Sequence, residues 1–351
     1  MRGWRVKDAA PYRRAAGWRF VGRDDPARPA NPYGSVYRGG LWPPDSEISR
    51  KGGPPLLPYT HGGDVLTAQA RYGGPVLDCS ANLNPLGMPP QVGEAAARAA
   101  ANAAPYPDPL CRELRAAIAA HDGVAPEQVL CGSGAAELIF RLAFALRPHR
   151  ALVTAPTFSE YEGALSAAGC AVTRHPLRRE RNFDVDEGLL EAIGPDTELV
   201  FLCTPNNPTG RLIDQELLLA AAEKCRGLGA VLAVDECFLP LACGGPGLVP
   251  WLEEYPNLLL LRAFTKSYAM AGLRLGYALS ADTALLERLS LSGPPWSVST
   301  PAQAAGLAAL TQCPHWPEKA RAFLEGERPA PAEGLSAPGL GVGPGQANYL
   351  L

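Results

Sequence analysis

Residues 230–236 read AVLAVDE, an unbroken apolar run that ends in two acidic residues. A second apolar run, LVFLC, stands at 199–203, and the Leu- and Ala-rich stretch between the two runs has the composition of a helix. A strand that is covered by helices on both faces of its sheet reads as a continuous apolar run, whereas a strand with one wet face alternates. The stretch 199–236 therefore predicts two parallel strands joined by a helix.

The same alternation continues outward in both directions along the chain. We expect strands at 128–131, 151–154, 171–174, 199–203, 230–234, 258–262 and 276–279, and helices at 95–103, 111–121, 135–146, 160–168, 214–226, 284–291 and 301–311. This pattern predicts an α/β fold in which a mostly parallel sheet is sandwiched between helices. Ligands of such sheets bind at the carboxyl ends of the strands, so we expect functional residues in the loops that follow them.

The composition argues against several classes of protein. No run of 18 or more apolar residues occurs in the 351 residues, and no apolar signal segment is recognisable, so we expect no membrane. The nine cysteines stand singly, without a C-x-x-C pair, which favours a reducing cytoplasm over disulfides or a zinc site; we therefore expect no metal. The net charge of −3 gives no reason to expect nucleic acid as a partner.

Two of the loops after strands carry small or amide side chains. GSGAAE (132–137) opens a helix, where bare backbone N–H groups would form an anion site, although a simple tight turn would look the same. TPNNPTG (204–210) presents Asn207 as a hydrogen-bond donor, although an ordinary Asn-Pro turn would also fit.

Three charged residues follow the next strands. Asp235 ends a buried strand, where a carboxylate needs a positive partner. Lys266 stands between apolar flanks, and a desolvated lysine is suited to Schiff-base chemistry. Arg274 offers a guanidinium fork to a phosphate. Each of these residues alone could equally be a solvated or ion-paired side chain.

Together these features are the groups needed to hold pyridoxal phosphate. The lysine would bond the cofactor's aldehyde, and the acid would keep the ring nitrogen protonated. Backbone N–H groups, Thr265 and Arg274 would hold the phosphate, while Asn207 would bond the ring hydroxyl. Phe158 would stack on the ring, although a lone phenylalanine is more often a core residue.

Three motifs carry a resemblance to a known family: TPNNPTG (204–210), VDE (234–236) and FTKSYAMAGLRLGY (264–277). They resemble fold-type-I pyridoxal-phosphate enzymes of the class I/II aminotransferase superfamily, in the group that holds the histidinol-phosphate aminotransferases and the threonine-phosphate decarboxylases. The segments HGGD (61–64), SANLNPLG (80–87) and PPWSVS (294–299) favour the decarboxylases. Phe238 does so too, because the aminotransferases usually place a tyrosine there.

The resemblance also implies roles for individual residues. Lys266 and Asp235 would be the catalytic residues, and Asn207 would contact both the cofactor and the substrate carboxylate. The other cofactor-binding residues would be Ala135, Ala136, Phe158, Thr265 and Arg274. The remaining substrate-binding residues, His61, Gly62 and Asn82, would belong to an N-terminal arm that closes over the substrate.

The activity that the resemblance implies is decarboxylation of L-threonine O-3-phosphate to (R)-1-aminopropan-2-yl phosphate and CO2, in cobalamin biosynthesis. The enzyme would be a cytoplasmic homodimer that acts on a small phosphorylated amino acid. One alternative is histidinol-phosphate or a related aminotransferase. Another is an inactive pyridoxal-phosphate-binding remnant, because two substrate-binding arginines of the family are expected beyond residue 351.

Four segments are expected along the chain. Residues 1–55, rich in Arg, Pro and Gly, would be a poorly ordered extension, or else a basic arm for an anionic partner. Residues 56–100 would form the N-terminal arm and part of a small domain, and 101–295 the large cofactor-binding domain. The resemblance implies that residues 296–351 are a truncated C-terminal small domain, with a strand at 346–351.

Overall fold

The computed structural model describes residues 62–337, 339 and 341–351. The chain divides into two compact units, residues 1–82 and 83–351. In the described part of the first unit, helix α1 (Val65–Tyr72) begins after Asp64, whose side chain accepts a hydrogen bond from the N–H of Thr67. The predicted extension at 1–55 lies outside the described residues.

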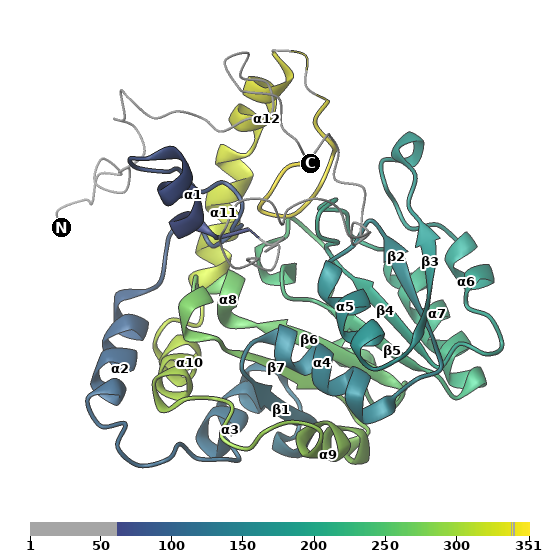
Figure 1. Cartoon of the computed structure of the whole chain (residues 1–351), viewed down its shortest axis with the longest axis horizontal. Coiled ribbons are helices and arrows are strands. Elements are labelled where there is room, and N and C mark those ends of the chain that lie inside the picture. Colours follow the sequence, from purple (N-terminus) through teal and green to yellow (C-terminus); the bar gives the residue numbers. More distant parts are fainter. Residues whose placement is uncertain (1–61, 338, 340) are drawn as a thin grey trace, which may run out of the picture. The chain divides into compact units, whose positions relative to one another are not determined.

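The second unit is built on one seven-stranded sheet (Figure 1). Its strands are β1 (Val129–Gly132), β2 (Arg150–Ala155), β3 (Ala171–Pro176), β4 (Leu199–Cys203), β5 (Val231–Asp235), β6 (Leu258–Ala263) and β7 (Gly276–Leu279). They lie in the order β1-β7-β6-β5-β4-β2-β3. Strand β7 is antiparallel to both of its neighbours, and the other neighbouring pairs are parallel. The prediction of a mostly parallel α/β sheet is confirmed.

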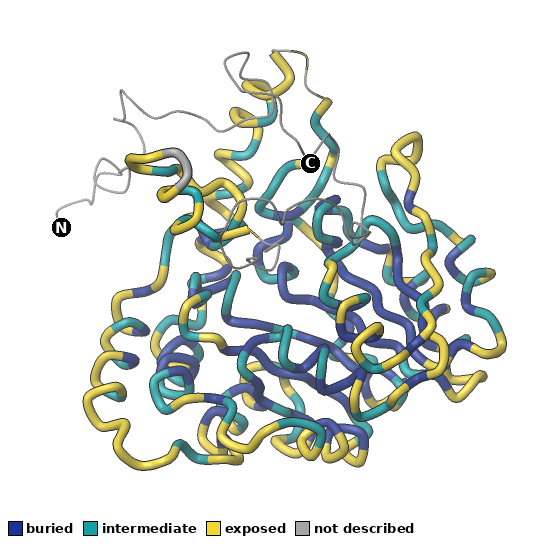
Figure 2. The backbone as a smooth tube through the Cα atoms, viewed as in Figure 1, coloured by how far each residue is buried: buried dark blue, intermediate teal, exposed yellow. Residues whose placement is uncertain are grey.

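Alternate residues of the central strands enter two separate apolar cores. Leu258 and Leu260 of β6 pack in one core, and Leu259 and Leu261 in the other. The first core is shared with α2 (Pro90–Ala100), α3 (Arg112–Asp122), α7 (Gln215–Leu228) and α10 (Thr300–Gln312). The second is shared with α4 (Ala135–Leu146), α5 (Ser159–Ala167) and α9 (Thr283–Leu291). Because both faces of the sheet are covered, its central strands are buried along their length (Figure 2).

Side-chain caps fix where several of these helices begin. Asp214 accepts hydrogen bonds from two N–H groups at the start of α7, Asp282 caps α9, and Ser299 caps α10. Such caps satisfy donors that the first helical turn leaves without partners. The capped helices all match predicted ones within about two residues, the usual uncertainty of a helix end.

Five α-helices of the described residues were not among the predicted elements: α1, α6 (Gly188–Ala192), α8 (Phe264–Ser267), α11 (Trp316–Glu327) and α12 (Pro329–Ser336). The predicted strand at 346–351 is wrong, since these residues form no strand. They are held instead by isolated hydrogen bonds: Gln346 N–H donates to Gly210 O at 2.6 Å, and Cys243 N–H donates to Gln346 O at 3.0 Å. These partners are loop residues, which offer no ladder to extend.

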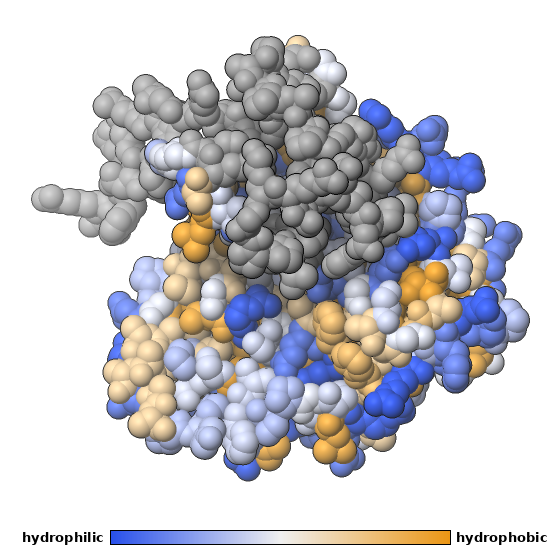
Figure 3. Space-filling model, viewed as in Figure 1, coloured by the Kyte–Doolittle hydropathy of each residue, from blue (hydrophilic) through white to orange (hydrophobic). Residues whose placement is uncertain are grey.

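On the described part of the face in Figure 3, hydrophilic and hydrophobic residues are interspersed. All nine cysteines carry free thiols. Among the described residues, no helix combines the length and apolar character needed to cross a bilayer.

Candidate active site

The register of the sheet brings several predicted residues to one edge. Cys203 pairs with Asp235, and Asp235 pairs with Leu261, so β4, β5 and β6 end close together. Strand β7 runs the other way and begins at this edge, with Gly276 opposite Gly132 and Ala263. Arg274, two residues before β7, is therefore carried to the same edge as the loops that follow the parallel strands.

Asp235 is the buried acid of this edge, with an exposed fraction of 5%. Its Oδ2 accepts a hydrogen bond from the Tyr161 hydroxyl at 2.7 Å, and its Oδ1 accepts one from the Cys237 N–H at 2.9 Å. Burial raises the pKa of this carboxyl, while the two hydrogen-bond partners and the charge of Lys266 act in the opposite direction. A cationic ligand group would favour the ionised form of Asp235.

Lys266 lies in α8 (Phe264–Ser267), the short helix that follows β6. Its Nζ is 5.0 Å from the centroid of the Phe238 ring. Buried Asn84 holds the turn around it, because the Asn84 N–H donates to Lys266 O at 3.0 Å and Nδ2 donates to Ser267 O at 2.7 Å. Half-buried Thr265 precedes the lysine in the same turn.

The first turn of α4 meets Arg274 at a glycine. Gly134 has φ of +83° and caps the helix without a side chain, and a Cβ built there would lie 2.6 Å from Nη2 of Arg274. Ala135 and Ala136 follow as the first residues of the helix. Within the described part of the chain, no carboxylate pairs with Arg274. The bare helix N-terminus and this guanidinium form a cradle for an anion.

Two neighbouring asparagines in the loop after β4 differ in their surroundings. Asn206 is buried, and its amide bonds Pro156 O at 3.0 Å, Thr209 Oγ1 at 3.0 Å and Thr157 Oγ1 at 2.8 Å. Asn207 is half-buried, and its side chain bonds no residue that the structure describes. The first asparagine fixes the loop, which leaves the amide of the second for a ligand.

The Tyr161 ring, whose hydroxyl bonds Asp235, packs against two other aromatic rings. Phe158 precedes α5, and its ring meets that of Tyr161 edge to face with centroids 5.6 Å apart. Fully buried Tyr161 stacks on Phe201 at 5.0 Å. Sequence reasoning gave Tyr161 no role, and its position three residues after Phe158 was the only available signal.

Tyr349 is a second residue that sequence reasoning missed. Its hydroxyl donates to Asn206 O at 2.8 Å, and its ring stands edge-on to Phe238 with centroids 4.9 Å apart. Burial raises the pKa of this phenol well above its usual range. No pattern in the sequence connects residue 349 with the loop at 206, so only the structure reveals this contact.

The predicted arm residues lie elsewhere in the chain. His61 is outside the described residues. Gly62 and Asn82 belong to the first unit, where a Cβ at Gly62 would come within 2.5 Å of Ser80 O. The roles of these three residues stay predictions.

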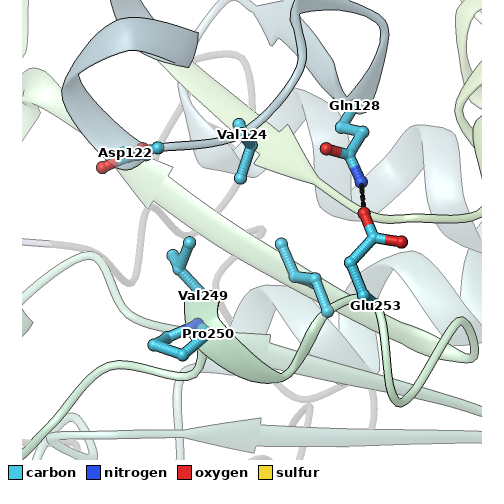
Figure 4. Close-up of a pocket in the computed structure, with 8 residues that line it drawn as sticks. Asp122, Val124, Gln128, Val249, Pro250 and Glu253 are labelled. Carbon is cyan, nitrogen blue, oxygen red and sulfur yellow. Dashed lines mark hydrogen bonds between the residues drawn. The ribbon is translucent and has the colours of Figure 1, made fainter.

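A pocket elsewhere in the second unit contains none of the predicted residues (Figure 4). It lies between the end of α3 and the segment 249–253, and Gln128 donates across it to Glu253 at 2.6 Å. The Asp122 carboxylate accepts a hydrogen bond from Arg262 at 2.8 Å. Among the described residues, no group of three or more His, Cys, Asp or Glu side chains could hold a metal ion.

The donor set at the sheet edge fits pyridoxal phosphate. The cofactor has an aldehyde for an amine, a ring nitrogen that an acid keeps protonated, and a phosphate for an anion cradle. Lys266, buried Asp235, and Gly134 with Arg274 match these three groups in turn.

Residues 75–351 match the family "Aminotransferase class I and II", so the chain belongs to this family. Its members are enzymes with fold type I that use pyridoxal phosphate. The chain is 40% identical to the threonine-phosphate decarboxylase of Salmonella typhimurium over 300 residues, which cover 84% of this chain and 82% of that protein.

Aminotransferases are also among its relatives. The chain is 36% identical to the histidinol-phosphate aminotransferase of Anaeromyxobacter sp. over 305 residues, covering 84% of this chain and 82% of that protein. The crystal structure of the histidinol-phosphate aminotransferase from Clostridium acetobutylicum superimposes with a TM-score of 0.69 at 26% identity, covering 76% of this chain and 79% of that chain.

Proposed function

We propose that this protein is a pyridoxal-phosphate-dependent decarboxylase that converts L-threonine O-3-phosphate to (R)-1-aminopropan-2-yl phosphate and CO2. The observation that carries the cofactor part is the buried Asp235 carboxylate beside the charge of Lys266. The 40% identity to a threonine-phosphate decarboxylase supports the choice of reaction.

Each residue of the edge has a distinct task in this proposal. The Lys266 amine would hold the cofactor through its aldehyde and, when freed by the substrate's amine, would donate the proton that replaces CO2 on the α-carbon. Asp235, held by Tyr161 and the Cys237 N–H, keeps the proton on the ring nitrogen. This charge pair makes the ring a strong electron acceptor and favours the ionised carboxylate that burial alone disfavours.

The remaining residues orient the cofactor. The start of α4, Thr265 and Arg274 bind its phosphate, with Ala135 and Ala136 contributing backbone N–H groups. Phe158 would lie against the ring face, and Asn207 would donate to the ring hydroxyl. These contacts would fix the cofactor ring at its phosphate, at its nitrogen and on its face. A fixed ring limits the orientations that a substrate joined to it can adopt.

The reaction is then decided by which bond of the substrate stands perpendicular to the ring. When bound, pyridoxal phosphate accepts the electron pair that a broken bond at the α-carbon leaves behind. Decarboxylation breaks the bond to the carboxylate, and a proton takes its place on the α-carbon. In the proposal, Asn207 and the arm residues His61, Gly62 and Asn82 hold the substrate so that its carboxylate points along this axis.

Transamination of histidinol phosphate is the second candidate, supported by the 36% identity to one such enzyme and the fold shared with another. The same cofactor residues would serve, but the bond to hydrogen would stand perpendicular to the ring. Lys266 would then carry that proton between carbon atoms.

The proposal also includes the setting of the enzyme. We place it in cobalamin biosynthesis, as a cytoplasmic homodimer with a large cofactor-binding domain at 101–295. The free thiols of all nine cysteines support a reducing compartment.

The test is a pair of assays on the purified protein loaded with pyridoxal phosphate. Release of CO2 and aminopropanol phosphate from L-threonine O-3-phosphate, absent in Lys266→Ala, is the expected result. Glutamate formation from histidinol phosphate and 2-oxoglutarate, without CO2 release in the first assay, would assign the second candidate instead.

A further inference from the structure

Arg141 is a buried arginine in the middle of α4, and its side chain is only 7% exposed. Its Nε and Nη2 donate to the same oxygen, Oε1 of Glu137, at 3.0 and 2.8 Å. The two residues are four apart in the helix, so the pair lies along one helical face. Burying a guanidinium is costly unless all of its N–H donors form hydrogen bonds. The partners of the other donors therefore show what this arginine holds together.

The other three N–H donors of Arg141 bind backbone carbonyls of a distant segment. They reach Leu289 O at 3.3 Å, Ser290 O at 2.8 Å and Pro294 O at 2.8 Å. A Cβ at Gly293 would lie 2.4 Å from Cζ of Arg141, so this segment wraps closely around the guanidinium. All five donors of the arginine are therefore used within the protein, and none is left for a ligand.

The second carboxylate oxygen of Glu137 points toward the anion cradle. Its Oε2 accepts a hydrogen bond from the backbone N–H of Ser133 at 2.5 Å. Ser133 is the central residue of the turn that leads through Gly134 into α4, and Gly134 is the residue that faces Arg274. The Glu137 side chain thus holds the backbone of this turn, and the turn determines where the first N–H groups of α4 point.

The charge of this pair explains why the glutamate is accompanied by an arginine. A lone carboxylate beside an anion site would repel the anion and weaken its binding. Arg141, bound to Glu137 through two donors, balances that charge and leaves the hydrogen bond to Ser133 intact. A lysine would keep the charge but lacks the planar fork that reaches Glu137 and the 289–294 segment together.

We propose that Glu137 and Arg141 are positioning residues for the phosphate group of the cofactor. They act through the Ser133–Gly134 turn, which they lock to the segment at 289–294, and they do not touch the ligand. This inference rests on the proposed function, because the turn binds a phosphate only if pyridoxal phosphate is the cofactor.

The test compares two ligands that differ only in the phosphate. Dissociation constants for pyridoxal phosphate and for pyridoxal are measured by titrating the apoprotein, in wild type and in Glu137→Gln. The single carbonyl oxygen of a glutamine can accept from Arg141 or from the Ser133 N–H, but not from both. Its NH2 group is itself a donor and would face the other donor without forming a hydrogen bond. We expect the dissociation constant for pyridoxal phosphate to rise about 10-fold and that for pyridoxal to change by less than about 2-fold.

One control and one further variant complete the test. Glu162→Gln is a matched substitution on α5, where Glu162 pairs with Arg174 at the surface, and it should leave both constants unchanged. Arg141→Lys should weaken pyridoxal phosphate selectively, and it replaces Glu137→Gln if that variant does not fold. The protection that inorganic phosphate gives the apoprotein against thermal unfolding should fall in the same variants.

The possible failures are distinguishable. Equal weakening of both ligands, or no weakening of pyridoxal phosphate in folded variants, overturns the positioning role alone. Failure of the wild-type protein to bind pyridoxal phosphate overturns the proposed function and this inference with it.

Discussion

Replacing Tyr161 with phenylalanine removes one hydroxyl, which donates to Oδ2 of Asp235 at 2.7 Å in a fully buried position. Nothing else about the ring needs to change, since a phenylalanine at this position could keep the stacking on Phe201 that Tyr161 makes at 5.0 Å. The substitution therefore isolates one hydrogen bond to the acid of the site.

The size of the effect follows from the charge of Asp235. A hydrogen bond to a charged group contributes about 1.5–3 kcal/mol, and about 1.4 kcal/mol corresponds to a tenfold change in a binding constant. The protonated ring nitrogen of pyridoxal phosphate requires the ionised carboxylate, whereas burial in the apoprotein raises the pKa of Asp235 toward the neutral form. The hydroxyl thus stabilises the loaded state more, and Tyr161→Phe should weaken pyridoxal phosphate about 10- to 100-fold.

The assay is a titration of apoprotein with pyridoxal phosphate, repeated in an Asp235→Asn background. In that background the charged acceptor is gone, so Tyr161→Phe should change the dissociation constant by less than about 2-fold, as a double-mutant cycle requires. Tyr255→Phe, on a tyrosine that contacts Arg226, is the matched control and should have no effect. An unchanged dissociation constant in Tyr161→Phe, or the same loss in both backgrounds, would show that the Tyr161 hydroxyl does not support the charge of Asp235.

Three further predictions follow from the same geometry. Arg274→Gln should weaken pyridoxal phosphate about 10-fold or more but leave pyridoxal nearly unaffected, because the guanidinium lies at the phosphate cradle; equal losses in the two titrations would contradict this. Asp235→Asn should raise the free energy of unfolding of the apoprotein in urea, and the gain should grow as the pH rises. A carboxyl whose folded pKa is raised stabilises the fold below its unfolded pKa of about 3.9 and loses that contribution as the pH rises through the folded pKa. A difference between the two proteins that does not change with pH would contradict the raised pKa. Tyr268→Phe should be neutral or stabilising by up to about 1–3 kcal/mol in the same assay, since the buried Tyr268 hydroxyl has no hydrogen-bond partner among the described residues; a clear loss of stability would reveal a partner for it.

The strands of the sheet could be predicted because their signal is local. A run such as 258–262 is apolar on both faces, and β6 was found as Leu258–Ala263. The same pattern predicted that Asn207, Asp235 and Lys266, which come at the ends of successive strands, lie at one edge of the sheet. The carboxyl ends of parallel strands share that edge.

The contacts that complete the site depend on residues far apart in the chain. Tyr161 meets Asp235 across 74 positions, and Tyr349 meets Asn206 across 143, without any periodic pattern. Arg274 reaches the edge only because β7 is antiparallel to its neighbours, a direction that an apolar run does not encode. The family resemblance predicted a strand at 346–351, but the hydrogen-bond partners of this segment are loop residues, so no strand forms there.

The bond proposed between Lys266 and pyridoxal phosphate can be located directly, because the chain contains few lysines. The chain has five: Lys7, Lys51, Lys224, Lys266 and Lys319. Protein loaded with the cofactor is reduced with borohydride, which fixes the bond, and is then digested and mapped by mass spectrometry. We expect a single modified peptide that contains Lys266 and is absent from Lys266→Ala. Label on another lysine, equal label on all five, or undiminished label in Lys266→Ala would contradict it.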